Sequence, residues 1–151
     1  GSGIKNDIIS IFNGENIISK IQRKNSKKKT TVFDLLNEPD CQLESRIEFS
    51  HKNSSSPREI TISINDPLIG LPNKIENLKP KYNKYRKTWQ MNFKGKFVLK
   101  SIKNSILVDE QLNKLMYVRK TTKNDLDIDI FTQIDEIFIF YIAISSFLCK
   151  I

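Results

Sequence analysis

The end of the chain is apolar on every side of a helix, and this feature constrains the possible folds most. Apolar residues occupy position 134, every position from 137 to 144 and position 147, which covers the whole circumference of a helix and not one stripe. We therefore expect a helix surrounded by protein, with a capping-box-like start formed by Thr132 and Asp135. A buried strand is the alternative, because Ile, Phe and Tyr also favour strands.

The rest of the chain consists of short apolar segments between polar turns, which is typical of a mainly β protein. Residues 58–64 are the clearest strand, because Ile60, Ile62 and Ile64 alternate with polar residues. Further strands are predicted at 7–12, 16–24, 29–35, 43–50, 88–93, 96–108 and 114–119, with a bend near residues 100–101. A mainly β chain that ends in a helix apolar on every side favours a barrel with a helix inside it.

Length and cysteine content indicate one intracellular domain. The 151 residues fit a single domain over 4–151, and residues 1–3 (Gly-Ser-Gly) resemble a cloning scar. Two cysteines and the lack of a signal-like start indicate reduced thiols and a cytoplasmic protein, with the nucleus as a further location. The longest apolar run, 137–144, is shorter than the roughly 20 residues that cross a bilayer. We therefore expect no transmembrane segment.

Basic residues gather in three windows that contain one acid among them. Residues 20–29, 74–87 and 94–103 carry net charges of +6, +5 and +4, so the rest of the chain is net negative although the total is +8. A charge divided in this way attracts an anionic partner, such as a lipid head group or a nucleic acid. For any single lysine, a solvent-facing strand position without function is the alternative.

The sequence does not indicate an enzyme, a metal site or a cofactor. The one histidine, His51, lies in a polar Ser-rich segment without an orienting carboxylate, and one histidine with two distant cysteines lacks the spacing of a zinc site. The alternating acids of residues 125–129 lack the glycine and the glutamate of a calcium loop. We interpret them as the solvent-facing side of a strand.

Two segments resemble signatures of the tubby family. Residues 93–104 (FKGKFVLKSIKN) resemble the family's F-K/H-G-R-V-x-x-A-S-V-K-N, and residues 140–150 (FYIAISSFLCK) resemble its ending, F-A-I-A-L-S-S-F-x-S-K. Weaker similarity joins residues 6–10 to N-Y-L-I-S and residues 29–34 to T-K-F-T-V-Y-D. The resemblance spans nearly the whole chain but only the later part of the family's domain, whose first strands have no counterpart here. It implies a closed barrel threaded by the C-terminal helix.

The resemblance also implies a binding site for phosphatidylinositol 4,5-bisphosphate on the outside of the barrel. The family's pocket motif K-L-R-S-N falls on residues 20–25, so that Lys20 takes the place of the family's Lys and Gln22 that of its Arg. Lys20 and Gln22 should face outward and Arg23 inward, unless a one-residue bulge turns Arg23 into the Arg role. The implied phosphoinositide-binding residues are Asn6, Lys20, Gln22, Arg23, Lys24 and Arg46.

Two departures from the family pattern predict weaker or less selective head-group binding. Gln22 replaces one family arginine, and Cys41 stands at the position of another, so that charge is missing unless Arg46 substitutes for it. The resulting hypothesis is a reversible membrane tether and trafficking adaptor, peripheral at the plasma membrane, that carries protein cargo. A nucleic-acid-binding protein that uses the same basic surface is the first alternative, supported by aromatic residues such as Tyr82 and Tyr85 among the cations. Against it, Trp89, Met91 and Phe93 alternate at strand spacing, which favours core residues. An interaction domain with a decayed lipid site is the second.

Overall fold

One large sheet and one helix make up the body of the protein. The computed structural model describes residues 8–27, 30–51, 57–65 and 71–150. Within these ranges, nine strands form an antiparallel sheet in the order β1-β2-β3-β4-β5-β6-β9-β10-β11, and β7 pairs with β8 alone. The elements are β1 (Ile8–Asn13), β2 (Asn16–Lys27), β3 (Thr30–Asn37), β4 (Gln42–Ser50), β5 (Glu59–Ile64), β6 (Lys74–Asn77), β7 (Lys81–Asn83), β8 (Thr88–Gln90), β9 (Ser105–Val108), β10 (Lys114–Lys120), β11 (Leu126–Ile130) and α1 (Glu136–Leu148).

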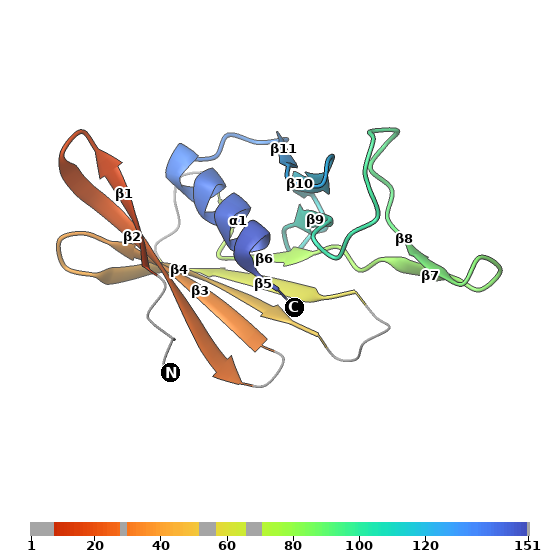
Figure 1. Ribbon diagram of the computed structural model, residues 1–151, viewed down its shortest axis with the longest axis horizontal. Coiled ribbons are helices and arrows are strands. Elements are labelled where there is room, and N and C mark those ends of the chain that lie inside the picture. The colour runs from red at the N-terminus through yellow and green to blue at the C-terminus, as the bar shows by residue number, and fades with distance from the viewer. Residues whose placement is uncertain (1–7, 28–29, 52–56, 66–70, 151) are drawn as a thin grey trace.

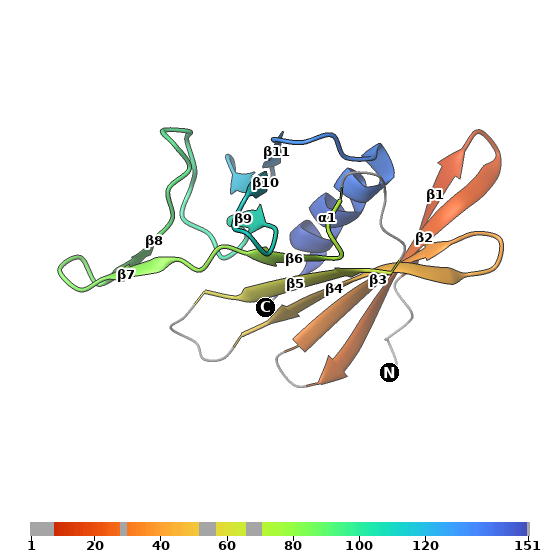
Figure 2. The same cartoon turned by 180° about the vertical axis from the view of Figure 1, so that it is seen from behind.

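The sheet curls around α1 but does not close. Register shifts in the β1–β2, β2–β3, β3–β4 and β9–β10 ladders add local twist and bend the sheet. Its edge strands are β1 and β11, and no ladder joins them in the described part of the chain. Figures 1 and 2 show α1 lying between the β1–β2 end and the β9–β11 end. A mainly β fold with a C-terminal helix is confirmed, whereas closure into a barrel is not, because the edge strands β1 and β11 do not pair within the ranges described above.

The helix packs one side on the concave face of the sheet. Its buried residues include Phe138, Tyr141 and Ile142, and the Tyr141 hydroxyl lies within hydrogen-bond distance of the carbonyls of Phe33 and Ser45, which share its one hydrogen. The prediction of a helix, rather than a buried strand, is confirmed. The prediction that protein surrounds it is wrong in part: Phe140 is 43% exposed, because the open sheet leaves one side of α1 uncovered.

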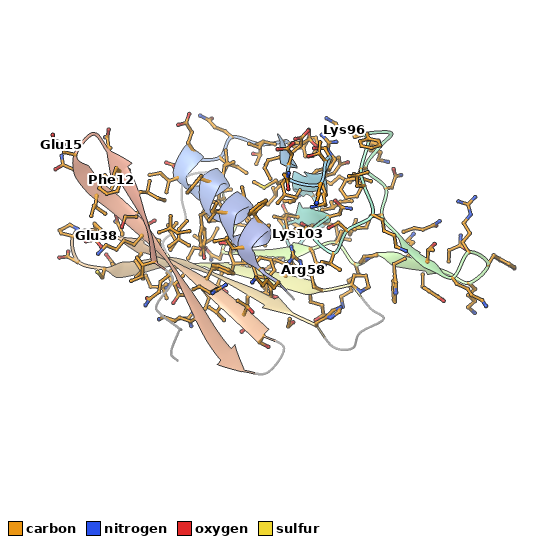
Figure 3. The ribbon with its side chains drawn as sticks, viewed as in Figure 1. Phe12, Glu15, Glu38, Arg58, Lys96 and Lys103 are labelled. Atoms are coloured by element: carbon orange, nitrogen blue, oxygen red, sulfur yellow. The ribbon has the colours of Figure 1, made fainter. Side chains whose placement is uncertain are left out.

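The helix starts at a different residue from the one predicted, and two cations cap its C-terminal end. At the start, Asp135 is the N-cap and its carboxylate accepts from the Ile137 N–H at 2.8 Å, so the start predicted at Thr132 is wrong. At the end, Arg58 donates to the carbonyls of Ser146 and Cys149, and Lys103 donates to the carbonyl of Phe147 (Figure 3). Cations placed there pair with carbonyls that have no partner within the helix and favour the negative end of its dipole.

The predicted strand at 96–108 is the largest error in the secondary structure. Only β9, its last four residues, is a strand. In the preceding segment, Asn104 supplements a backbone hydrogen bond from the Leu99 N–H to the Lys120 carbonyl at 2.8 Å: its amide donates to the Leu99 carbonyl and its oxygen accepts from the Lys120 N–H, both at 2.7 Å. Strands β6 and β7 lie outside all the predicted strands, because their three or four residues are too few to show a period of two.

No helix in the described ranges is long and apolar enough to cross a membrane.

Candidate functional site

The two faces of the sheet differ in chemistry along β2, β3 and β4. Odd-numbered residues such as Ile21, Phe33 and Ile47 are buried on the concave face, toward α1. Even-numbered residues point to the outer face, since side chains alternate along a strand. The register places Gln22 opposite Asp34, and Asp34 opposite Arg46. One row of side chains therefore crosses three strands on the outer face.

Asp34 is the centre of this row. Its carboxylate is only 1% exposed and accepts two hydrogen bonds from Arg46, to Oδ1 at 2.7 Å and to Oδ2 at 2.9 Å. Lys24 Nζ lies 3.1 Å from Oδ2. Burial by itself would raise the pKa of Asp34, but the hydrogen bonds from Arg46 and Lys24 outweigh it and hold the pKa below its usual value. Asp34 is therefore a buried anion that fixes two cations side by side.

The charged ends of these cations remain accessible. The side chains of Lys24 and Arg46 are 48% and 46% exposed, although both contact the buried carboxylate. A side-on, bidentate Arg–carboxylate pair has a fixed geometry, so Asp34 positions Arg46 and leaves the outer surface of both cations open to solvent. Such a surface can receive a phosphate group.

The low pKa of Asp34 makes a prediction for the pH dependence of stability. A carboxyl group with a lowered pKa in the folded state stabilises the fold above its unfolded pKa of about 3.9, and that contribution is lost as the pH falls through the folded value. We expect Asp34→Asn to lower the free energy of unfolding at pH 7 by more than it does at pH 3. Urea denaturation of both proteins across this range measures the difference, and a cost that does not change with pH would contradict the assignment.

Lys20 lies on the same outer face but pairs with a different acid. Its Nζ is 3.2 Å from Glu38 Oε1. Cys41, in the turn after β3, donates its thiol hydrogen to the same oxygen at 3.4 Å, and this hydrogen bond raises the pKa of the thiol. Cys41 is therefore a hydrogen-bond partner of Glu38 and supplies no positive charge to the site. Arg46, by contrast, lies in the row with Gln22 and Asp34.

The structure brings together four of the six residues implied by the resemblance. Lys20, Gln22, Lys24 and Arg46 share the outer face. Arg23 pairs with Phe33, and no register shift occurs between Ile21 and Lys24, so it lies on the opposite face as the alternation predicts. The bulge that would have brought it into the site is absent there. Asn6 lies outside the described residues.

The three basic windows of the sequence do not include two carboxylates that belong to the site. Asp34 and Glu38 lie outside the basic window 20–29, yet cross-strand pairing places both beside its lysines. The alternation along β3 is the sequence feature that indicates the face of Asp34, because it places Asp34 on the same face as Val32 and Leu36. The net charge of the cluster is therefore lower than the basic window alone indicates.

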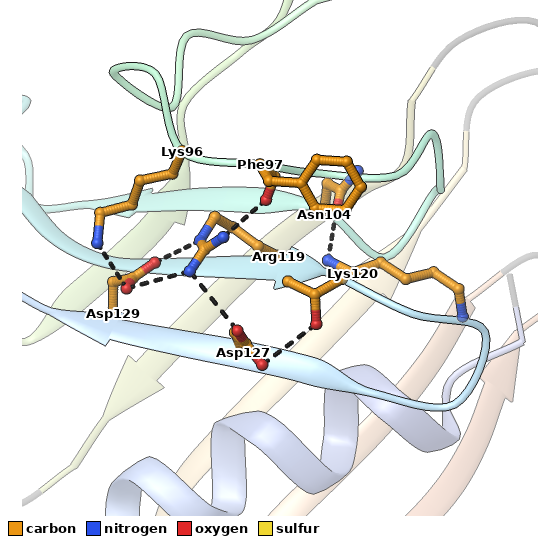
Figure 4. Close-up of polar contacts among 8 residues, drawn as sticks. Lys96, Phe97, Asn104, Arg119, Lys120, Asp127 and Asp129 are labelled. Atoms are coloured by element: carbon orange, nitrogen blue, oxygen red, sulfur yellow. Dashed lines mark hydrogen bonds and ion pairs between the residues drawn. The ribbon is translucent and has the colours of Figure 1, made fainter.

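Two lysines of the third basic window (residues 94–103) make contacts that stabilise the fold, and they lie outside this site. Lys96 Nζ is 2.9 Å from Asp129 Oδ1, and Asp129 also accepts from Arg119 (Figure 4). Lys103 contacts the end of α1. Asp127 is 53% exposed, as expected for the solvent-facing side of a strand, whereas Asp129 is 17% exposed because Arg119 and Lys96 cover it. Within the described ranges, no three His, Cys, Asp or Glu side chains gather as they would to hold a metal ion.

The fold and the site together define an antiparallel β domain with a C-terminal apolar helix and a cationic cluster on its outer face. In a comparison with protein families, residues 8–148 match the Tub family, and the chain belongs to that family. The match includes both segments that resemble tubby signatures apart from the last two residues of the second. No curated protein matches the chain.

Proposed function

We propose that this protein is a non-enzymatic module that binds phosphoinositide head groups and attaches reversibly to the cytoplasmic face of the plasma membrane. Membership of the Tub family supports the ligand class. The observation that carries the proposal is the arrangement of Lys24 and Arg46 around the buried Asp34, with Lys20 and Gln22 on the same face. Protein cargo carried to the membrane belongs to the same proposal.

The chemistry of the cluster suits a bisphosphorylated inositol ring. The Arg46 guanidinium offers planar donors to one phosphate, and the lysine ammonium groups act as point charges beside it. Gln22, between Lys20 and Lys24 along β2, can donate its amide to a phosphate or ring oxygen without adding charge. Asp34 and Glu38 offset part of the positive charge of the cluster, and Gln22 and Cys41 stand where the family pattern has arginines. We therefore expect a lower affinity for the head group than a cluster with those two arginines would have.

Sedimentation with lipid vesicles tests this proposal. We expect more protein to pellet with phosphatidylcholine vesicles that contain phosphatidylinositol 4,5-bisphosphate than with phosphatidylcholine alone. Lys20→Ala and Lys24→Ala should each weaken binding about fivefold, since a basic residue near an anionic surface contributes about 1 kcal/mol. The matched control is Lys123→Ala, an exposed lysine in the turn between β10 and β11. Equal pelleting with both vesicles, or an equal loss in all three variants, would refute the site.

One observation favours a second candidate, an interaction domain without lipid binding. Lys20, Lys24 and Arg46 each have a carboxylate partner within 4 Å, so the cluster is satisfied without a ligand. In that case neither phosphoinositide vesicles nor nucleic acid would bind at physiological salt. A nucleic-acid-binding protein would instead show affinity for DNA or RNA that falls steeply with salt, with little preference for the bisphosphorylated lipid.

A further inference from the structure

The β7–β8 hairpin is an arm that projects from the body of the protein. Among the described residues, β7 and β8 pair only with each other, and Figures 1 and 2 show them extending away from the end of β6, on the side opposite to β1 and β2. Asn83 closes the turn, because its side-chain oxygen accepts from the N–H groups of Tyr85 and Arg86 at 2.9 and 3.1 Å. The turn therefore has a defined shape although it is exposed.

Aromatic rings are exposed on this arm, where no core requires them. Tyr85, in the turn, is 98% exposed. Tyr82 and Trp89 face each other across the two strands with ring centroids 5.2 Å apart, and they are 50% and 42% exposed. The alternation of Trp89 with Met91 and Phe93 predicted three core residues, yet only Phe93 is fully buried. The prediction for Trp89 is wrong, because its strand belongs to the arm and not to the main sheet.

The arm is strongly basic. Residues 77–108 contain nine Lys+Arg and no Asp or Glu. Five of these cations lie on or next to the hairpin: Lys79, Lys81, Lys84, Arg86 and Lys87. In the described part of the chain, no ion pair joins any of the five to a carboxylate, whereas in the site on β2–β4 all three cations contact one of two carboxylates. The hairpin thus carries positive charge that the fold does not neutralise.

We propose that the β7–β8 hairpin is a second membrane contact, which places Tyr85 and Trp89 in the interfacial region of an anionic leaflet. Tyr and Trp favour the level of the lipid head groups, where one part of the ring is apolar and its polar tip stays hydrated. The flanking cations attract anionic lipids such as phosphatidylserine without requiring a specific head group. This contact extends the proposed function, but it does not require the β2–β4 site.

A membrane fits the hairpin better than a single-stranded nucleic acid does. Proteins that bind single strands stack bases on open ring faces along a charged groove. Here Trp89 packs against Tyr82, which covers part of both rings, and the hairpin is a projecting arm. A projecting tip with exposed rings and no acid complements a flat anionic surface.

The chain contains one tryptophan, so its fluorescence reports directly on the hairpin. We expect the Trp89 emission to shift to shorter wavelength when the full chain is mixed with phosphatidylcholine–phosphatidylserine vesicles that lack phosphoinositide, and to be quenched by brominated lipid. Tyr85→Ser should reduce this shift, and the double variant Lys84→Gln/Arg86→Gln should weaken binding about tenfold or more. The control Leu112→Ser, at a residue 66% exposed in the turn between β9 and β10, should leave the shift unchanged.

The outcomes separate this contact from the head-group site. If Lys20→Ala/Lys24→Ala loses the preference for phosphatidylinositol 4,5-bisphosphate but keeps the emission shift on phosphatidylserine vesicles, the hairpin contact stands by itself. An unshifted emission on anionic vesicles would overturn it, even if phosphoinositide binding persists. A shift that hairpin variants leave intact would overturn it too. So would a response of Trp89 to single-stranded RNA but not to vesicles, which would make nucleic acid the partner.

Discussion

Replacing Phe138 with alanine is expected to lower the free energy of unfolding by about 3–5 kcal/mol, the usual cost of truncating a buried aromatic residue. Phe138 is 2% exposed, and its ring centroid lies 5.9 Å from that of Tyr141. It belongs to the same core cluster as Ile75, Leu107 and Met116. Removal of its ring would leave a cavity in this part of the core, and the cavity adds to the cost of the lost apolar contacts. Urea denaturation followed by far-UV circular dichroism measures the loss.

Phe140→Ala is the matched control on the same helix. Phe140 is two residues away and 43% exposed, so its truncation should cost less than about 1 kcal/mol. The pair therefore tests which side of α1 faces the sheet. Equal losses would mean that both rings are buried, as they would be in a closed barrel, and would contradict the open sheet.

Replacing Arg119 with methionine is expected to cost about 2–3 kcal/mol, because hydrogen bonds that involve charged groups contribute more than neutral ones. Arg119 is 8% exposed, donates to Asp129 from Nε and one terminal nitrogen, and donates to the Phe97 carbonyl at 2.7 Å from the other (Figure 4). It thereby joins β10 and β11 to the irregular segment before β9. Methionine keeps most of the apolar stem but leaves Asp129 and the Phe97 carbonyl without this donor.

Asp127→Asn is the control for Arg119→Met. The Asp127 side chain is 53% exposed and 3.8 Å from Arg119, and exposed pairs of this kind contribute little. We expect a change within about 0.5 kcal/mol in the same denaturation experiment. A loss as large as that of Arg119→Met would show that the exposed pair, rather than the Asp129 and Phe97 contacts, stabilises this corner.

The fold was predictable where a single period extends over a whole strand. Residues 58–64 alternate without interruption, and β5 (Glu59–Ile64) follows that pattern in the main sheet. The period of two gave a wrong prediction at Trp89. Alternation indicates that the two faces of a strand differ in polarity, but it does not indicate which sheet the strand joins. It also could not predict closure: each strand pairs locally, whereas closure depends on whether the first and last strands meet.

The candidate site was predictable in part. The period of two along β2 placed Lys20, Gln22 and Lys24 on one face and Arg23 on the other, as the register shows. The contribution of Asp34 could not be inferred, because it depends on the alignment of three strands and on how far Lys24 and Arg46 reach toward it. The hydrophobic end of the chain predicted a helix but not its exposed side, since composition does not tell how much of a helix the sheet covers.

The most direct test of the head-group site is a crystal structure of the protein soaked with soluble inositol 1,4,5-trisphosphate. The proposed function predicts density for the ligand on the outer face of β2–β4, with phosphates in contact with Lys24 and Arg46 and with Lys20 at the edge. An empty outer face, or a ligand bound at the β7–β8 hairpin instead, would contradict it.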